Sequence, residues 1–160
     1  MIRQIKIGNR MVGDNYPPLV IAEVGINHNG NLKTAMRMVD AAKKAGAECI
    51  KFQYHIPDKE MIMNNTIPGN AKESIWKIIK KNHLSEHEEE ELFHYVKKKK
   101  LIYLSTPFSK EAAIKLFNLG VDAFKIGSGE CNNYPLIDII SSFKKPIILS
   151  TGMNNYETVS

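Results

Sequence analysis

Residues 123–136, AFKIGSGECNNYPL, contain a lysine, Lys125, inside an apolar stretch that is otherwise typical of a buried strand. Residues 48–53, ECIKFQ, repeat the arrangement with Lys51. Because side chains alternate between the two faces of a strand, each lysine projects to the face opposite its apolar neighbours. An unpaired ammonium is costly to bury, so two such lysines predict that an anion binds where the strands end.

Short apolar runs alternate with helix-forming segments along the chain. The predicted strands cover residues 19–25, 48–53, 101–107, 123–128 and 146–152. The predicted helices cover residues 31–46, 71–82, 85–100, 109–120 and 135–143. Residues 5–13 predict a small hairpin that turns at Gly8 and Asn9. Strand–helix alternation with short connections favours parallel strands covered by helices, an α/β fold.

Two architectures fit this alternation, a doubly wound open sheet and a (β/α)8 TIM barrel. Polar side chains end every predicted strand, and active sites of barrel enzymes lie at that end. The phosphate-binding loop motifs of the open-sheet folds are not found in the sequence, which favours the barrel. A barrel needs eight strands and typically ~250 residues, so this chain is expected to cover about the first five strands. Residues 1–15 would form a hairpin that caps the barrel, and residues 16–160 its first part.

Composition excludes several classes of protein. The formal net charge is +5, but the basic residues are not gathered into an arm with interleaved aromatics, so nucleic-acid binding is disfavoured. No apolar run reaches the ~18–20 residues that span a bilayer, and the first residues lack the apolar region of a signal peptide. Two cysteines in no paired spacing fit a reducing compartment, so a cytoplasmic location is expected.

The most strongly charged segment, residues 85–100, is predicted to be a solvated helix. Ser85 and Glu88 form a capping-box pattern. Acids occupy the first turns and lysines the last, as the helix dipole favours. This segment therefore explains much of the charge without a binding function.

Five segments carry a family resemblance. They are IAEVGINHNG, IKFQ, STPFS, KIGSGECNNYPL and PIILSTGM, in this order. From about Ile5 to its last residue the chain resembles the bacterial sialic acid synthases, or N-acetylneuraminate synthases. The resemblance implies an enzyme that condenses phosphoenolpyruvate with N-acetylmannosamine, giving N-acetylneuraminate and phosphate. It also implies a divalent metal, Mn²⁺ or Mg²⁺, and a homodimer in the full-length form.

The resemblance assigns roles to particular residues. Five match positions that hold phosphoenolpyruvate: Lys51, Thr106, Lys125, Ser128 and Ser150. Glu130 matches an acid near the reacting carbons that would manage the proton of the attacking water, the alternative being a salt bridge to Lys125. Glu23 matches an acid of the sugar and metal region that would also orient Lys51. Gln53 and Asn70 match positions near the sugar, with local hydrogen bonding as the alternative.

The resemblance implies no metal ligand within this chain. The two metal-binding histidines of the family come from strands beyond Ser160, as does a C-terminal antifreeze-like domain that delivers an arginine. His28 is interpreted as fixing the first βα loop in preference to binding a metal. The remaining histidines are predicted to be surface or loop residues: His55, His83, His87 and His94.

Other functions stay open at this stage. Related synthases accept diacetamido-trideoxyhexoses and make legionaminic or pseudaminic acid. A 3-deoxy-octulosonate phosphate synthase would need further basic residues for a sugar phosphate, and no such cluster follows these strands. A truncated, inactive module that only binds an anion is the alternative from a different class.

Overall fold

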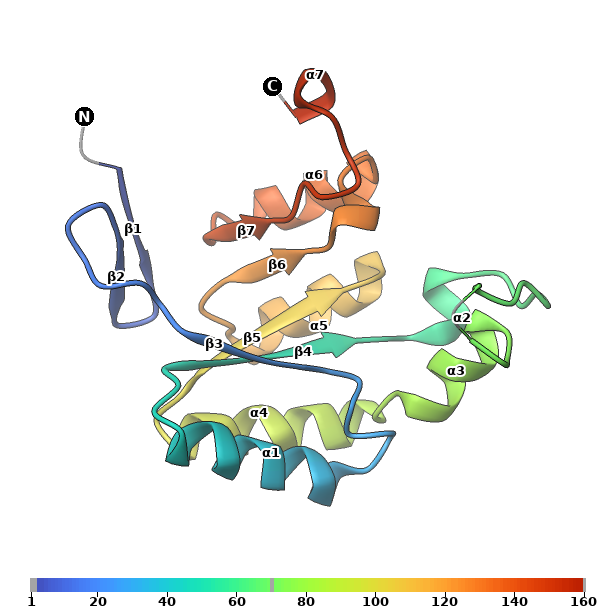
Figure 1. The fold of residues 1–160 in the computed structure, drawn as a ribbon, viewed down its shortest axis with the longest axis horizontal. Helices are drawn as coiled ribbons and strands as arrows, with labels where there is room; N and C mark the ends of the chain where they lie inside the picture. Colours follow the sequence, from blue (N-terminus) through green and yellow to red (C-terminus); the bar gives the residue numbers. More distant parts are fainter. Residues whose placement is uncertain (1–2, 70, 160) are drawn as a thin grey trace.

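Parallel strands and helices alternate in the computed structural model, which describes residues 3–69 and 71–159 (Figure 1). The strands are β1 (Gln4–Ile7), β2 (Arg10–Gly13), β3 (Ile21–Gly25), β4 (Cys49–Tyr54), β5 (Ile102–Pro107), β6 (Phe124–Ile126) and β7 (Ile147–Leu149). The α-helices are α1 (Leu32–Lys44), α2 (Pro57–Glu60), α3 (Ile75–Asn82), α4 (Glu86–Lys98), α5 (Lys110–Leu119), α6 (Tyr134–Ser142) and α7 (Tyr156–Val159). One 3₁₀ turn, η1, spans Ser128–Glu130.

The strands β3 to β7 follow one another in chain order around a partial barrel. Strands β3, β4 and β5 form one parallel sheet, β6 and β7 form another, and β6 lies beside β5 (Figure 1). Parallel βα units with an N-terminal hairpin confirm the prediction of a partial TIM barrel over the open-sheet alternative.

The two faces of the curved sheet bury different side chains. On the outer face Ile50, Phe52 and Phe124 pack on the helices in the main core. On the inner face a smaller core joins four buried residues, Ile7, Cys49, Leu104 and Ala123. Side chains therefore alternate between the two faces as predicted. The apolar residues beside Lys51 and Lys125 face the helices, and the lysines occupy inner positions.

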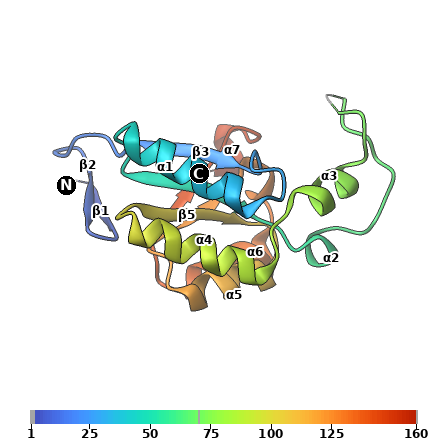
Figure 2. The same ribbon diagram turned by 90° about the horizontal axis from the view of Figure 1, so that it is seen from below.

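The two ends of the sheet carry different elements. The hairpin of β1 and β2 is antiparallel and lies at the amino-terminal ends of the parallel strands, where Ile7 joins the inner core. Helices α2 and α3 lie at the opposite, carboxyl-terminal end (Figure 2). The division between residues 1–15 and 16–160 stays a prediction.

Local sequence signals set the helix ends as expected. Asn31 caps α1 by accepting from the Thr34 amide at 2.8 Å, and Ser85 forms the capping box with Glu88. Gly120 ends α5 in the left-handed conformation at φ +83°.

Three details differ from the sequence-based expectations. Helix α2 was not predicted, because Pro57 and the polar residues after it favoured a loop. Helix α3 begins at Ile75, since Ser74 supplies its cap, and not at residue 71. Helix α4 buries one acid that was expected to be solvated, Glu89, which accepts a hydrogen bond from the Tyr103 hydroxyl at 3.0 Å.

No helix within the described ranges is long and apolar enough to cross a membrane.

Candidate functional site

Polar side chains meet on the inner face where the parallel strands end. The register of β3 and β4 sets Glu23 opposite Lys51, and that of β4 and β5 sets Gln53 opposite Thr106. These positions continue the inner face that Cys49 and Leu104 occupy one step earlier along the strands. The apolar inner core thus gives way to polar groups at the carboxyl end, the end at which barrel enzymes carry their active sites.

Lys51 and Glu23 form an ion pair across β3 and β4. The Lys51 side chain is 13% exposed, whereas that of Glu23 is 53% exposed, so the ammonium lies deeper than the carboxylate. The pair agrees with the expectation that Glu23 orients Lys51. One carboxylate neutralises one lysine, and the second lysine needs another partner.

Lys125 has no carboxylate partner among the residues the structure describes. Its Nζ donates to the Ser150 hydroxyl at 2.6 Å and to the Ile126 carbonyl at 2.5 Å. Burial lowers the pKa of Lys125, and repulsion from the Lys51 ammonium lowers this pKa further, against an opposing effect of Glu23. Two cations near enough to repel each other form a site in which an anion relieves that repulsion.

The segment after β6 folds against the end of β7. The Ser150 amide donates to the Ile126 carbonyl at 3.0 Å, and the Cys131 thiol donates to the Ser150 carbonyl at 2.7 Å. Asn154 reaches the Ser128 carbonyl at 3.4 Å. Residues Ser128 and Ser150, both expected to bind phosphoenolpyruvate, therefore belong to one connected loop pair beside Lys125.

Thr106 is buried next to the same loop pair. A Cβ on Gly127 would lie 4.0 Å from the Thr106 Cγ2, so the ends of β5 and β6 approach each other closely. Thr106 is 3% exposed. The structure thus gathers Lys51, Thr106 and Lys125 at neighbouring strand ends, as the sequence argument requires.

Glu130 lies at the rim of this region and does not pair with Lys125 in the described part of the chain. Its carboxylate accepts from the Asn133 amide at 2.6 Å. It lines a cavity of about 360 Å³ together with Gln53, Phe108 and apolar residues of α3. The salt-bridge alternative for Glu130 is therefore not what the structure contains.

His55 lies in the loop between β4 and α2, as predicted, but it is buried and not at the surface. His55 is 4% exposed, stacks on Phe108 with ring centroids 4.4 Å apart, and hydrogen-bonds both Glu60 and Gln53. The segment after β4 has no helical or strand periodicity, which predicts a loop but does not predict burial. Only the position of α2 brings Glu60 back onto His55, so no local sequence signal predicts this contact.

His28 fixes the first βα loop, as interpreted. Its Nδ1 accepts from the Gly30 amide at 3.2 Å, and the side chain is 1% exposed. Burial lowers the pKa of His28, electrostatic interaction with the neighbouring His55 lowers this pKa further, and Glu88 opposes the shift.

Two expectations concern other ligands. Asn70, expected near the sugar, lies outside the described residues. Within residues 3–69 and 71–159 no three His, Cys, Asp or Glu side chains gather into a group that could hold a metal ion. The described residues therefore do not fit a resident metal on their own.

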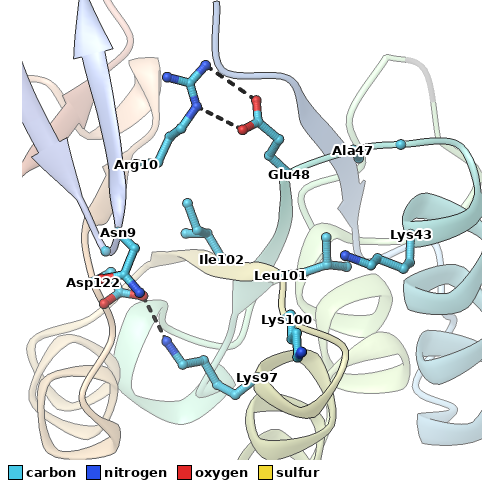
Figure 3. Close-up of a pocket in the computed structure, with 12 residues that line it drawn as sticks. Asn9, Arg10, Lys43, Ala47, Glu48, Lys97, Lys100, Leu101, Ile102 and Asp122 are labelled. Carbon is cyan, nitrogen blue, oxygen red and sulfur yellow. Dashed lines mark hydrogen bonds and ion pairs between the residues drawn. The ribbon is translucent and has the colours of Figure 1, made fainter.

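A larger cavity, of about 720 Å³, lies at the other end of the strands beneath the hairpin (Figure 3). Arg10 pairs with Glu48 at 2.8 Å, and Lys97 pairs with Asp122 at 3.0 Å. Because these ion pairs join the hairpin and helix α4 to the strand connections, they are structural contacts. We therefore place the candidate site at the carboxyl end, although its cavity is the smaller one.

Residues 38–160 match the family model described as the NeuB family. The chain belongs to the NeuB family. The match includes all the predicted site residues except Glu23, which precedes it.

Individual members of the family are similar over nearly the whole chain. An uncharacterized protein of Methanocaldococcus jannaschii is 39% identical over 96% of this chain and 43% of its own length. The N,N'-diacetyllegionaminic acid synthase of Campylobacter jejuni is 38% identical over 86% of this chain and 43% of its own. The crystal structure of a sialic acid synthetase from Leptospira borgpetersenii superposes with a TM-score of 0.85 at 29% identity, covering 99% of this chain and 53% of that one.

The chain spans less than half the length of these two curated relatives. The comparisons show the family and the fold of this chain. They do not show which reaction the whole protein catalyses.

Proposed function

We propose that the protein condenses phosphoenolpyruvate with N-acetylmannosamine and releases N-acetylneuraminate and phosphate. The proposal rests on two half-buried lysines that repel each other, Lys51 on β4 and Lys125 on β6, the strands that flank β5. Phosphoenolpyruvate offers a phosphate and a carboxylate on one three-carbon molecule. Its two anionic groups match a site with two ammonium groups and neighbouring hydroxyls.

The chain's own residues would bind and orient this substrate. Lys51, already aligned by Glu23, and Lys125, aligned by Ser150, supply the charge. Thr106, Ser128 and Ser150 add hydroxyl donors. Because these groups are fixed by strand register and by the loop contacts after β6 and β7, little reorganisation is needed when the anion arrives.

The proposed reaction forms one carbon–carbon bond and breaks one carbon–oxygen bond. C3 of phosphoenolpyruvate attacks the aldehyde carbon of the open-chain sugar, whose oxygen takes up a proton to become a hydroxyl. Water adds at C2, and the resulting intermediate expels phosphate by cleavage of the C2–O bond. Glu130, on the rim beside Gln53, is the proposed group that accepts the proton of this water.

Enzymes of the NeuB family are metal-dependent, and a bound metal would polarise the aldehyde. We propose that the metal ligands lie outside the described residues, which do not form a metal site.

A diacetamido-trideoxyhexose is the second candidate acceptor. A relative 38% identical to this chain is named for N,N'-diacetyllegionaminic acid synthesis, which favours that candidate. The similar structure from Leptospira borgpetersenii is named for sialic acid, which favours N-acetylmannosamine.

A phosphate-release assay tests the proposal. The complete natural protein is incubated with phosphoenolpyruvate, Mn²⁺ and either N-acetylmannosamine or a diacetamido-trideoxyhexose. Release that depends on N-acetylmannosamine supports the proposal, and release with only the second sugar assigns the alternative acceptor. Binding of phosphoenolpyruvate without release by any of these sugars would show an anion-binding module.

A further inference from the structure

A buried carboxylate–histidine pair, His55 and Glu60, lies in the wall of the cavity that Gln53 and Glu130 also line. His55 follows β4, and Glu60 is the last residue of the short helix α2. The His55 Nδ1 lies 2.9 and 3.0 Å from the two oxygens of Glu60. Their side chains are 4% and 2% exposed, so solvent does not screen this contact. A buried carboxylate is costly unless it is paired, so Glu60 depends on His55.

The other ring nitrogen of His55 reaches the candidate site. Nε2 lies 3.2 Å from the Oε1 of Gln53, which is two residues back on β4. Carboxylate and amide oxygens only accept hydrogen bonds, so the ring satisfies both neighbours when both of its nitrogens carry hydrogen. The stacked ring of Phe108 holds the imidazole in the plane that reaches both partners.

This contact determines which way the Gln53 amide faces. With the Gln53 Oε1 turned to His55, the Gln53 NH2 group lies on the side of Gly25. A Cβ on Gly25 would be 4.0 Å from the Gln53 Nε2 and 3.4 Å from a Glu23 carboxylate oxygen. Gln53 also lines the cavity that contains Glu130. Its amide therefore lies between the anion-binding strand ends and that cavity, with its donor group fixed.

We propose that His55 and Glu60 are positioning residues, which hold the Gln53 amide so that its NH2 group meets an oxygen of the acceptor sugar. The proposal rests on the proposed function, since it concerns recognition of the second substrate. A free glutamine samples both orientations of its amide and several rotamers, whereas the bonded one presents a donor. The Glu60–His55 pair thus acts on the acceptor and not on phosphoenolpyruvate.

Steady-state kinetics on the complete natural protein test this positioning role. Each substrate is varied in turn while the other is kept at a saturating concentration. Glu60→Gln keeps the shape and removes the charge, so the KM for the acceptor sugar should rise about tenfold while the KM for phosphoenolpyruvate stays within about twofold. The matched control is Glu90→Gln, which removes the carboxylate of an exposed His–Glu pair on α4. The control should change neither KM.

Epistasis separates positioning from a merely structural role. In a Gln53→Ala background Glu60→Gln should cause no further rise in acceptor KM, because the amide that it orients is gone. An equal rise in both KM values, or a full effect of Glu60→Gln without Gln53, overturns the proposal. Should Glu60→Gln lower the unfolding temperature too far to assay, Phe108→Leu loosens the His55 ring without a change of charge and should raise acceptor KM about threefold.

The outcome for the unaltered protein keeps the two proposals apart. If it turns over an N-acylated sugar but Glu60→Gln and Phe108→Leu leave acceptor KM unchanged, positioning by His55 is rejected and the proposed function stands. If it turns over none of these sugars, the proposed function fails and the positioning role fails with it.

Discussion

Lys125 donates a hydrogen bond to the Ser150 hydroxyl at 2.6 Å, from the middle of β6 to the residue that follows β7. The contact joins residues 25 apart in the sequence, and it turns the ammonium to the inner face of the partial barrel. Because a hydroxyl and a carbonyl are uncharged, they leave the positive charge of Lys125 available to pair with a bound anion.

Replacing Lys125 by methionine should weaken binding of phosphoenolpyruvate by about tenfold to a hundredfold. The lost interaction is a charge-assisted hydrogen bond, worth ~1.5–3 kcal/mol. The unfolding temperature should stay the same or rise, because Lys125→Met removes a desolvated charge that Lys51 repels. Calorimetric titration and thermal unfolding measure the two effects. Lys43→Met, an exposed lysine near the far cavity, is the control and should alter neither.

Replacing Glu23 by glutamine should tighten binding of phosphoenolpyruvate roughly 1.5- to 5-fold. The carboxylate is half exposed and pairs with Lys51, so its influence on a bound anion is that of a surface ion pair, ~0.2–1 kcal/mol. Turnover should fall in the same variant, because Lys51 loses its alignment. Titration and phosphate release measure affinity and rate separately. Weaker binding of the anion would contradict the assignment of Lys51 to the anion site.

Replacing Gly25 by alanine should cost ~1–2 kcal/mol of stability, because its φ of +57° is left-handed. The new Cβ would also lie in van der Waals contact with Glu23 and Gln53, at 3.4 and 3.8 Å, and would add bulk beside two proposed site residues, so acceptor KM should rise. Gly46→Ala is the matched control, with φ +84° and no atom within 4 Å of the added Cβ. Urea unfolding should show similar losses for both, and kinetics should separate them. Equal kinetics in the two variants would remove Gly25 from the site.

Stability should fall as pH rises from about 4.5 to about 8. Burial raises the pKa of Glu89 to about 8, against an ordinary value of 4.5, although the Tyr103 hydroxyl opposes the shift. The folded state therefore binds a proton that the unfolded state releases in this window, and the penalty is complete above the folded pKa. A single such group gives a slope of roughly 1.4 kcal/mol per pH unit at most.

Glu89→Gln isolates this contribution, because glutamine keeps an acceptor for Tyr103 and cannot ionise. The variant should be more stable than the unaltered protein at pH 7 and nearly equal to it at pH 4. Urea unfolding at several pH values measures the difference. A parallel pH dependence in the two proteins would exclude Glu89 as its source.

Much of the fold was predictable because its signals are local. Asn31, Ser85 and Ser109 cap helices through side chains three residues from the amides that they bond. The alternation of Lys51 with Ile50 and Phe52 fixes which face of β4 meets the helices. These patterns depend on neighbours in the chain, so no tertiary knowledge is needed to interpret them.

Other features depend on which segments meet in space. Glu89 lies three, four and seven residues before Leu92, Phe93 and Val96, so helical periodicity places it on the apolar face of α4. Only the packing of that helix on Tyr103 shows that a carboxyl group is buried there and hydrogen-bonded. Similarly, the placement of α2 buries Glu60 against His55, which the sequence assigned to a loop.

The sequence by itself determined the βα order, the helix caps and the inward direction of both lysines, since dihedral preferences and side-chain alternation are properties of short segments. Only the tertiary structure decided that Lys51 pairs with Glu23, that Lys125 is left without a carboxylate, and that His55 is buried. The physical reason is that burial and charge pairing depend on strand register and helix packing, which bring together groups that the chain keeps apart.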